Sequence, residues 1–257
     1  MNRPRHPSMR LATSRRQLLA VVLVLAAVFA ATRAVGTLGP PAWRWLLPAG
    51  FVCMAFTPWL LLDAEGRRHI GLAPAGPRRW YWYSLALAGG AALAMFGFGV
   101  GLLAFGDSSN HWYVSIAGSY QRTMDTRSLP LWALYLIFTV PALMFSPIGE
   151  ELFFRGMLQQ ALQDKLSAPL ATGVECSLFA VVHLCHHGVL WTAAGLDWTP
   201  RSAWPWMALM FGTAWWFAWL RQRSGSLYPA IVAHMGFNAV MNATIFCCLW
   251  PPGVAGA

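Results

Sequence analysis

Long apolar runs separated by short polar segments occupy most of this chain. Seven of the runs are long enough to cross a membrane as helices, which takes about 17–25 residues. They lie near residues 17–36, 43–62, 80–105, 131–163, 167–184, 204–221 and 226–249. The pattern therefore predicts an all-α fold, a polytopic membrane helix bundle of about seven transmembrane helices.

The composition supports a membrane protein and argues against a soluble one. Hydrophobic residues make up 57% of the 257 residues, charged residues only 11%, and the mean hydropathy is +0.48. That is too apolar for an ordinary soluble domain. The formal net charge of +9 is spread over the loops, so we expect contacts with the lipid bilayer and no nucleic acid.

The basic residues predict the orientation of the bundle. Twelve of the 18 Lys and Arg lie in the N-terminal segment and in alternate loops; five lie on the opposite side, where segment 33–44 contributes Arg33 and Arg44. Under the positive-inside rule the N-terminus is cytoplasmic and the C-terminus external. The basic residues are almost all Arg, which suggests a GC-rich genome, and we expect a multi-pass protein of a bacterial inner membrane.

The N-terminus allows a second interpretation. Its Arg-rich start, the apolar run Leu18–Ala31 and the small residues that follow also fit a cleaved secretory signal peptide. We favour a retained first helix, because the later spans make this a membrane protein in either case.

Three of the nine acidic residues lie inside apolar spans, namely Glu150, Glu151 and Glu175. A charged side chain at the bilayer centre costs about 3 kcal/mol even on the mildest scales, so such residues face the protein interior and indicate function by default. The adjacent pair makes the fourth span the first candidate for a functional site.

Within the fourth span, Glu151 and Arg155 are four residues apart with the acid first, the favourable order for an ion pair on one helical face. Ser146 and Pro147, just before them, are suited to restarting a helix. Glu150 points about 100° away and has no cation at helical spacing. It is predicted to be an unpaired carboxylate suited to proton transfer. In the alternative interpretation, the three charged residues form a salt-bridge cluster that only serves packing.

Two later spans carry further polar residues. In the fifth span, Glu175 lies eight residues before His183, and it either orients this imidazole or faces another helix. In the seventh span, His234 and Asn238 are four residues apart and therefore share a face, and Gly236 permits a neighbouring helix to approach. Each of these residues alone is more often a packing residue than a functional one, so their convergence with the acidic pair decides the interpretation.

In their order along the chain, these residues resemble the motifs of the CPBP (CAAX-processing and bacteriocin-processing, or Abi) family of intramembrane proteases. The matching motifs are Glu150-Glu151-x-x-Phe154-Arg155, Phe179-x-x-x-His183 and His234-x-x-x-Asn238, with the turn Ser224-Gly225-Ser226-Leu227 before the last. The resemblance covers about residues 130–245, whereas residues 1–125 match only as extra spans. Glu175 is a departure, because that helix face is usually small or apolar in the family.

The resemblance implies a division of the chain into four parts. Residues 1–16 form a basic cytoplasmic segment, and residues 17–125 contain three accessory transmembrane helices with their loops. Residues 126–250 form a catalytic core of four transmembrane helices, and residues 251–257 are a short tail.

The resemblance also implies an activity, the hydrolysis of a peptide bond in a membrane-associated protein or peptide substrate. We expect Glu150, assisted by His183, to activate a water molecule as general base. Glu151, held by Arg155, would help to shape the site.

In the same scheme His234 and Asn238 donate hydrogen bonds to the oxyanion of the tetrahedral intermediate, a stabilisation often worth ~3 kcal/mol per donor. Two chemistries stay open. A zinc ion could be ligated by Glu150, His183 and His234 with one position left for water. A mechanism without a cofactor is favoured, because the chain has no His-Glu-x-x-His helix.

Other classes of function stay open on the residues alone. A haem protein could use His183 and His234 as axial ligands, but this leaves the acidic pair unexplained. A proton-coupled transporter could use the buried acids as a relay, yet no inverted repeat is visible. A non-catalytic membrane scaffold is the third alternative.

Some features select neither a ligand nor a substrate. The stretch from His183 to His187 could bind a metal, but its place at an external helix end predicts a solvated loop start. The family that the chain resembles includes proteases of prenylated CAAX proteins, bacteriocin maturation or immunity proteins, and enzymes that process C-terminal sorting tails, and nothing in the sequence selects among them. The external C-terminus and the composition make prenylated substrates less attractive, and the oligomeric state stays undetermined.

Overall fold

The computed structural model describes residues 15–103, 110–192 and 195–251. Within these ranges the chain is almost entirely helical. The long helices are α1 (Arg15–Leu38), α2 (Leu46–Leu61), α4 (Arg79–Leu103), α6 (Leu131–Met144), α9 (Ala168–Val182), α10 (Pro200–Ser224) and α11 (Tyr228–Thr244). The shorter elements are η1 (Pro41–Trp43), α3 (Ala64–His69), α5 (Trp112–Gln121), α7 (Ser146–Glu150), η3 (Glu151–Leu158), α8 (Gln159–Gln163), η4 (His183–Cys185), β1 (Val189–Thr192), β2 (Gly195–Trp198) and η5 (Ile245–Leu249).

The seven predicted spans coincide with seven long helical stretches whose ends differ from the prediction by a few residues. Among the described residues, six of these stretches are both long and apolar enough to cross a membrane. The seventh, α10, is 25 residues long but less apolar than the others. Because α10 packs against α9, α4 and α11, it belongs to the same bundle, and the predicted all-α polytopic fold is confirmed.

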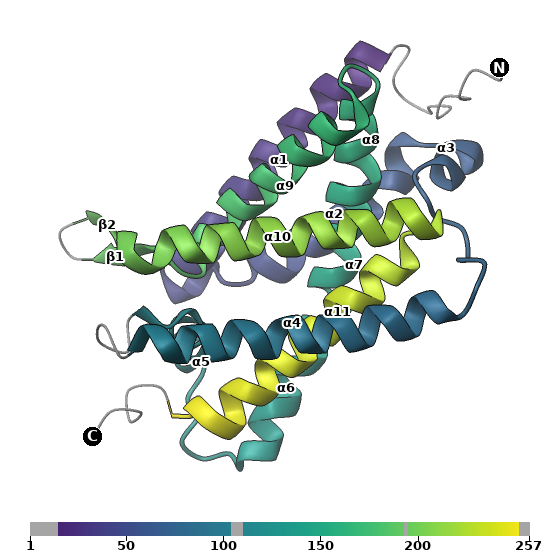
Figure 1. Cartoon of the computed structure of the whole chain (residues 1–257). Coiled ribbons are helices and arrows are strands. Elements are labelled where there is room, and N and C mark those ends of the chain that lie inside the picture. Colours follow the sequence, from purple (N-terminus) through teal and green to yellow (C-terminus); the bar gives the residue numbers. More distant parts are fainter. Residues whose placement is uncertain (1–14, 104–109, 193–194, 252–257) are drawn as a thin grey trace.

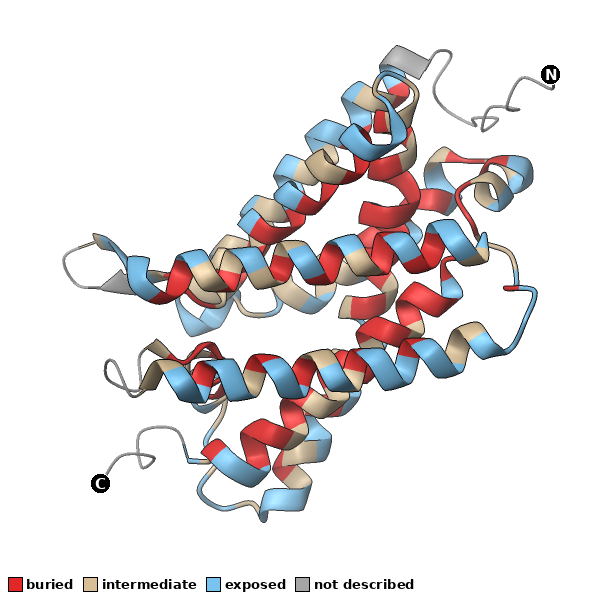
Figure 2. Ribbon diagram, viewed as in Figure 1, coloured by how far each residue is buried: buried red, intermediate tan, exposed pale blue. Residues whose placement is uncertain are grey.

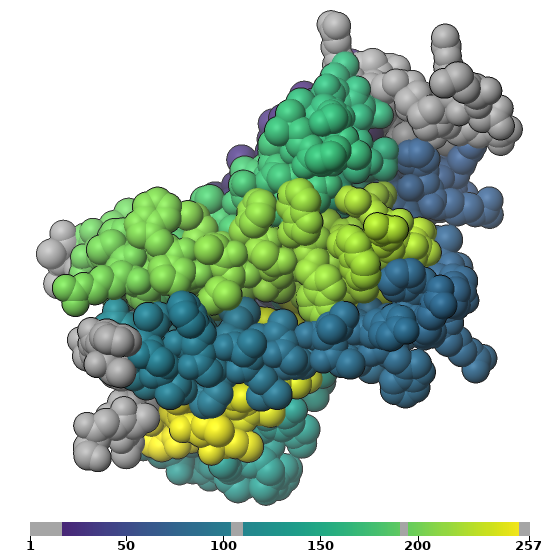
Figure 3. Space-filling model, in the orientation of Figure 1, coloured from purple at the N-terminus to yellow at the C-terminus, as the bar shows by residue number. Residues whose placement is uncertain are grey.

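The helices surround a central stretch that carries the two adjacent acids. In Figure 1, α1 and α9 lie on one side of the bundle, α10 crosses its middle, and α4, α11 and α6 lie on the other side. The α7–η3 stretch packs against α2 and α11. Figure 3 shows that the side chains of α10 and α4 form much of one outer face.

The fourth span is a helical stretch of 33 residues, 131–163, that is interrupted near its centre. Helix α6 ends at Met144, and Pro147 stands in the first turn of α7, where its missing N–H is not needed. The chain then continues as the π-helix η3, so Glu150 and Glu151 lie at the junction of two helix types. π-Helical segments are rare, and they are frequently found at functional sites.

The apolar pattern does not predict three short elements, namely α3, α5 and the hairpin formed by β1 and β2. Asp63 accepts a hydrogen bond from the backbone N–H of Gly66 (2.9 Å) and begins α3. The Nδ1 of His111 accepts one from the N–H of Tyr113 (3.1 Å) and begins α5. Strands β1 and β2 pair as one antiparallel hairpin. All three belong to connections between long helices.

Helices α11 and α4 pack closely where the sequence has small residues. A Cβ added to Gly236 would lie 3.2 Å from the Cδ2 of Leu85 and 3.5 Å from the Cβ of Ala88. The close helix approach expected at Gly236 is therefore confirmed.

Burial follows the arrangement expected for a bundle in lipid. Figure 2 shows buried residues on the inward faces of the helices and exposed residues on their outer faces. Large apolar side chains such as Val24, Leu60 and Trp132 are exposed, as lipid-facing residues would be. The interior instead holds several charged side chains, which are considered next.

Candidate active site

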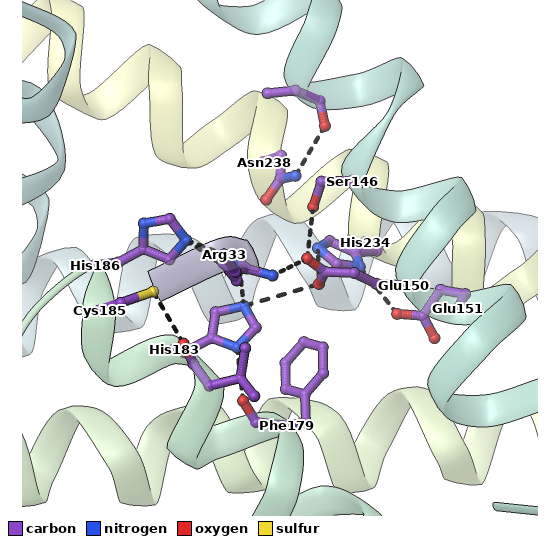
Figure 4. Close-up of polar contacts among 12 residues, drawn as sticks. Arg33, Ser146, Glu150, Glu151, Phe179, His183, Cys185, His186, His234 and Asn238 are labelled. Carbon is purple, nitrogen blue, oxygen red and sulfur yellow. Dashed lines mark hydrogen bonds and ion pairs between the residues drawn. The ribbon is translucent and has the colours of Figure 1, made fainter. Parts of the chain in front are cut away.

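Glu150 and Glu151 are both fully buried at the α7–η3 junction. Burial of two neighbouring carboxylates is costly unless each has charged or hydrogen-bonding partners. The structure supplies a different set of partners to each residue, and Figure 4 shows most of them.

Glu151 belongs to a buried network with Arg155 and Glu175. The Nε of Arg155 lies 3.3 Å from Oε2 of Glu151, the ion pair expected from their spacing, and 3.6 Å from Oε1 of Glu175. The guanidinium carbon of Arg155 also lies 4.0 Å from the ring centre of Phe179, a cation–π geometry. Of the two roles considered for Glu175, the structure places it against Arg155 on another helical stretch.

Glu150 also has a cationic partner, and the prediction that it is unpaired was wrong. Its Oε1 forms an ion pair with Nη1 of Arg33 on α1 and accepts a hydrogen bond from Ser146 Oγ at 3.3 Å. Helical spacing could not reveal this partner, because it is 117 positions away in the sequence. The other carboxylate oxygen of Glu150, Oε2, has no hydrogen-bond partner within the described part of the chain.

Arg33 is the functional candidate that the sequence analysis missed. It was counted with the external segment 33–44, whereas α1 continues to Leu38 and leaves Arg33 only 6% exposed. Its Nη2 lies 3.1 Å from Nε2 of His183 and 2.7 Å from Nε2 of His186. An arginine near the end of an apolar run, like an acid inside one, is the signal that could have found it.

His183 lies directly after α9, at the first position of η4, and faces Glu150. Its Nδ1 lies 2.7 Å from the carbonyl oxygen of Phe179, and its Nε2 lies 3.8 Å from Oε2 of Glu150. A carbonyl only accepts, so Nδ1 carries the hydrogen. A guanidinium only donates, so Nε2 accepts from Arg33. His183 is thus a neutral imidazole whose Nε2 lone pair is directed at Arg33.

His234 and Asn238 approach the acids from α11. The Nδ1 of His234 lies 2.9 Å from Oε1 of Glu151, and its Nε2 lies 4.0 Å from Oε2 of Glu150. Asn238 donates one amide hydrogen to the carbonyl of Ala142 at 3.0 Å, which leaves its second amide hydrogen for another acceptor. The six residues singled out by the sequence thus lie around one place: five of them are linked by side-chain contacts of 4.0 Å or less, and Asn238 lies at the edge.

A cavity of about 530 Å³ borders this cluster. Its walls are mostly aromatic and aliphatic, and its polar lining includes Arg33, His183, His234 and Asn238. Largely apolar pockets with a few convergent polar groups are the usual form of small-molecule and peptide sites. A segment of substrate in this cavity would lie beside both imidazoles.

The stretch after His183 is not a solvated loop start, so that expectation was wrong. Cys185 is 8% exposed, His187 is fully buried, and His186 contacts Arg33. The Nδ1 of His187 lies 2.8 Å from Oγ of Ser115 on α5. Burial, with a smaller contribution from the neighbouring His111 imidazole, lowers the pKa of His187 to about 4.

The described side chains around Glu150 are not arranged as a set of metal ligands. Among the described residues, no group of three or more His, Cys, Asp or Glu side chains is placed to hold one. The candidate ligands from the sequence are Glu150, His183 and His234. The guanidinium of Arg33 already pairs with Glu150 and donates to the Nε2 lone pair of His183. Zinc would need that same lone pair at about 2.0–2.1 Å.

Buried acids, imidazoles and an amide beside a cavity in a membrane helix bundle define the class of protein: a membrane protein with an intramembrane polar site. Residues 131–240 match the family model described as "Type II CAAX prenyl endopeptidase Rce1-like". This segment is a domain of the CPBP family, and the family implies a membrane-embedded endopeptidase that acts on a membrane-associated protein or peptide. No curated protein and no solved structure matches the chain.

Proposed function

We propose that the chain hydrolyses a peptide bond within the membrane with a water molecule activated by Glu150 and His183. The observation that supports this most directly is the gap between Oε2 of Glu150 and Nε2 of His183. At 3.8 Å it is too long for a direct hydrogen bond. Oε2 of Glu150 has no hydrogen-bond partner among the described residues and can accept one hydrogen of a water molecule in this gap. Nε2 of His183 carries no hydrogen, and it accepts the other one when the water replaces Arg33 as its donor.

The chemical step then proceeds by general base catalysis. Glu150 takes a proton from the water as its oxygen bonds to the carbonyl carbon of the substrate, whose π electrons move to the oxyanion. Collapse of this tetrahedral intermediate breaks the C–N bond, and the proton returns from Glu150 to the leaving amine. The products are a carboxylic acid, which then loses its proton to solvent, and an amine, and Glu150 is regenerated.

The oxyanion is stabilised by donors on α11. Asn238, with its second amide hydrogen, and His234 both line the cavity. Donation from Nε2 requires a proton there in addition to the one shared between Nδ1 and Glu151.

No metal takes part in the proposed step, because Arg33 supplies the positive charge beside Glu150. We further propose that the N-terminus is cytoplasmic, from the positive-inside count, and that the membrane is a bacterial inner membrane. The family name makes a prenylated CAAX peptide the first substrate to test. Non-prenylated membrane peptides are equally compatible with the apolar cavity.

The test uses two internally quenched peptides with the same sequence. In one of them the cysteine that is the fourth residue counted from the C-terminal end is S-farnesylated. The purified protein in proteoliposomes should cleave at least one of them. Glu150→Gln and His183→Ala should each lower the cleavage rate at least 10²-fold, because general base catalysis usually accelerates a reaction by at least that factor. Both variants should still elute as folded protein in size-exclusion chromatography. Glu65→Gln is the matched control, because Glu65 is exposed on α3.

Two results would overturn the proposal. One is full cleavage by Glu150→Gln, which would remove Glu150 from the chemistry. The other is no Glu150-dependent cleavage of either peptide, which a transporter or a scaffold would give.

A further inference from the structure

Arg33 reaches the site from a part of the chain that carries none of the family motifs. Helix α1 lies outside the matched residues 131–240. Yet the Arg33 guanidinium is inside the bundle, 6% exposed, and contacts three side chains of the site: Glu150, His183 and His186. An arginine buried in a membrane helix is costly to keep unless it has a specific role.

The first consequence concerns Glu150. Arg33 and Ser146 both bind Oε1 of this carboxylate. Rotation about the last bond of a glutamate is otherwise broad, so the two oxygens would exchange places freely. With Oε1 held, Oε2 is the oxygen that faces the imidazoles, at 3.8 Å from His183 and 4.0 Å from His234.

The second consequence concerns His183. Because Arg33 only donates, its contact with Nε2 requires the tautomer of His183 with hydrogen on Nδ1. Phe179 fixes the same tautomer from the other side of the ring. The two contacts therefore select the form in which Nε2 carries no hydrogen, so that it only accepts and leaves Oε2 of Glu150 open to water.

Arg33 is itself held in place. His186 accepts from its Nε at 3.1 Å and lies 2.7 Å from its Nη2, and the Phe51 ring lies 5.4 Å from its guanidinium carbon. Figure 4 shows the guanidinium between His186 on one side and Glu150 on the other. A charged group fixed at several points is suited to orienting a second group.

We infer that Arg33 is a positioning residue for the Glu150–His183 pair, so that the active site includes α1 in addition to the matched domain. The inference rests on the proposed function, in which that pair activates water. Arg33 does not receive the proton, since its guanidinium stays charged. It determines which oxygen of Glu150 faces the water, and it holds His183 in the tautomer with hydrogen on Nδ1.

The test compares Arg33→Gln, Arg33→Lys and Arg33→Ala in the farnesylated and unmodified quenched-peptide assays. Misplacing a reacting group by about 1 Å costs about 10²-fold. Arg33→Gln should therefore lower kcat about 100-fold with KM changed less than about 3-fold. Arg33→Lys should retain more activity than Arg33→Gln, because the ammonium can still pair with Oε1. Guanidinium ion at millimolar concentration should restore part of the activity of Arg33→Ala, because Arg33 borders the cavity.

The controls separate positioning from folding. Arg67→Gln removes an arginine whose Nη1 donates to the backbone carbonyl of Leu62 beside α3, and it should keep kcat and show no response to guanidinium. A purely structural Arg33 would give a lower melting temperature with no rescue by the ion, and that result would overturn the inference. If Glu150→Gln is inactive while Arg33→Gln has normal kcat, the inference fails and the proposed function stands. If Glu150→Gln is active, the proposed function itself fails.

Discussion

Two asparagines on α11, one turn apart, have different surroundings. Asn238 borders the cavity and uses one amide hydrogen on Ala142. Asn242 is fully buried, donates to Thr139 Oγ1 at 3.2 Å and accepts from the hydroxyl of Tyr120 at 2.7 Å. The first therefore has a free donor beside the site, and the second has both ends of its amide bound to other helices.

Alanine substitutions should separate these two roles. Asn238→Ala should lower kcat about 10²–10³-fold, the usual effect of removing an oxyanion donor, with a small change in melting temperature. Asn242→Ala should leave kcat within a few-fold but destabilise the protein by about 1–3 kcal/mol, because buried partners lose their hydrogen bonds. Steady-state kinetics and thermal unfolding in detergent measure both. Equal losses of kcat in the two variants would contradict the assignment of Asn238.

What the sequence could predict at this scale depended on the distance along the chain. The Glu151–Arg155 pair follows from a four-residue spacing, and the structure contains it. The Arg33–Glu150 pair spans 117 positions, and no periodicity connects residues so far apart. Burial of His187 and its contact with Ser115 likewise depend on how α5 docks.

At the scale of elements, the acid-bearing stretch is positioned by a contact between backbones. A Cβ added to Gly149 in α7 would lie 2.4 Å from the carbonyl oxygen of Phe51 in α2 and 3.0 Å from its carbon. Neither atom can move without shifting a helix. The residue before Glu150 must therefore be glycine for α7 to lie this close to α2.

Gly149→Ala should separate α7 from α2 and displace Glu150. We expect a loss of at least about 3 kcal/mol, the upper part of the usual range for overpacking, together with loss of activity. Gly97→Ala on α4 is the matched control, since an added Cβ there meets nothing within 4 Å. In an ordinary helix interior this change is favourable by up to about 1 kcal/mol. Equal melting temperatures for Gly149→Ala and Gly97→Ala would show that the close contact between α7 and α2 does not contribute to stability.

Which elements could be predicted from the sequence depends on whether they lie in the membrane. Hydrocarbon requires long apolar helices, so all seven were visible as runs in the sequence. The change from α-helix to the π-helix η3 adds only a small difference in hydrogen-bond pattern and leaves no mark in the apolar pattern. The hairpin β1–β2 and helices α3 and α5 lie outside the spans, where that pattern carries no information.

At the scale of the whole molecule, the buried charges come from parts of the chain far apart in sequence. The carboxylates lie on α7, η3 and α9, one guanidinium on η3, and the other on α1. The bundle must therefore assemble α1 with the matched domain before Glu150 has its partner. This couples the accessory helices to the site electrostatically as well as by packing.

This arrangement makes a specific prediction for metal removal. A zinc ion at Glu150, His183 and His234 would bring a +2 charge next to the Arg33 guanidinium, and the two cations would compete for Glu150 and for Nε2 of His183. Cleavage should therefore persist unchanged after dialysis against a strong chelator. Elemental analysis of the active protein should find less than one transition metal per chain. Arg33→Ala provides a comparison, because removal of the guanidinium leaves Glu150 and the Nε2 of His183 without their cationic partner. Activity lost to chelator and restored by zinc in the unmodified protein would refute metal-independent chemistry, whereas zinc binding confined to Arg33→Ala would show that Arg33 excludes the ion.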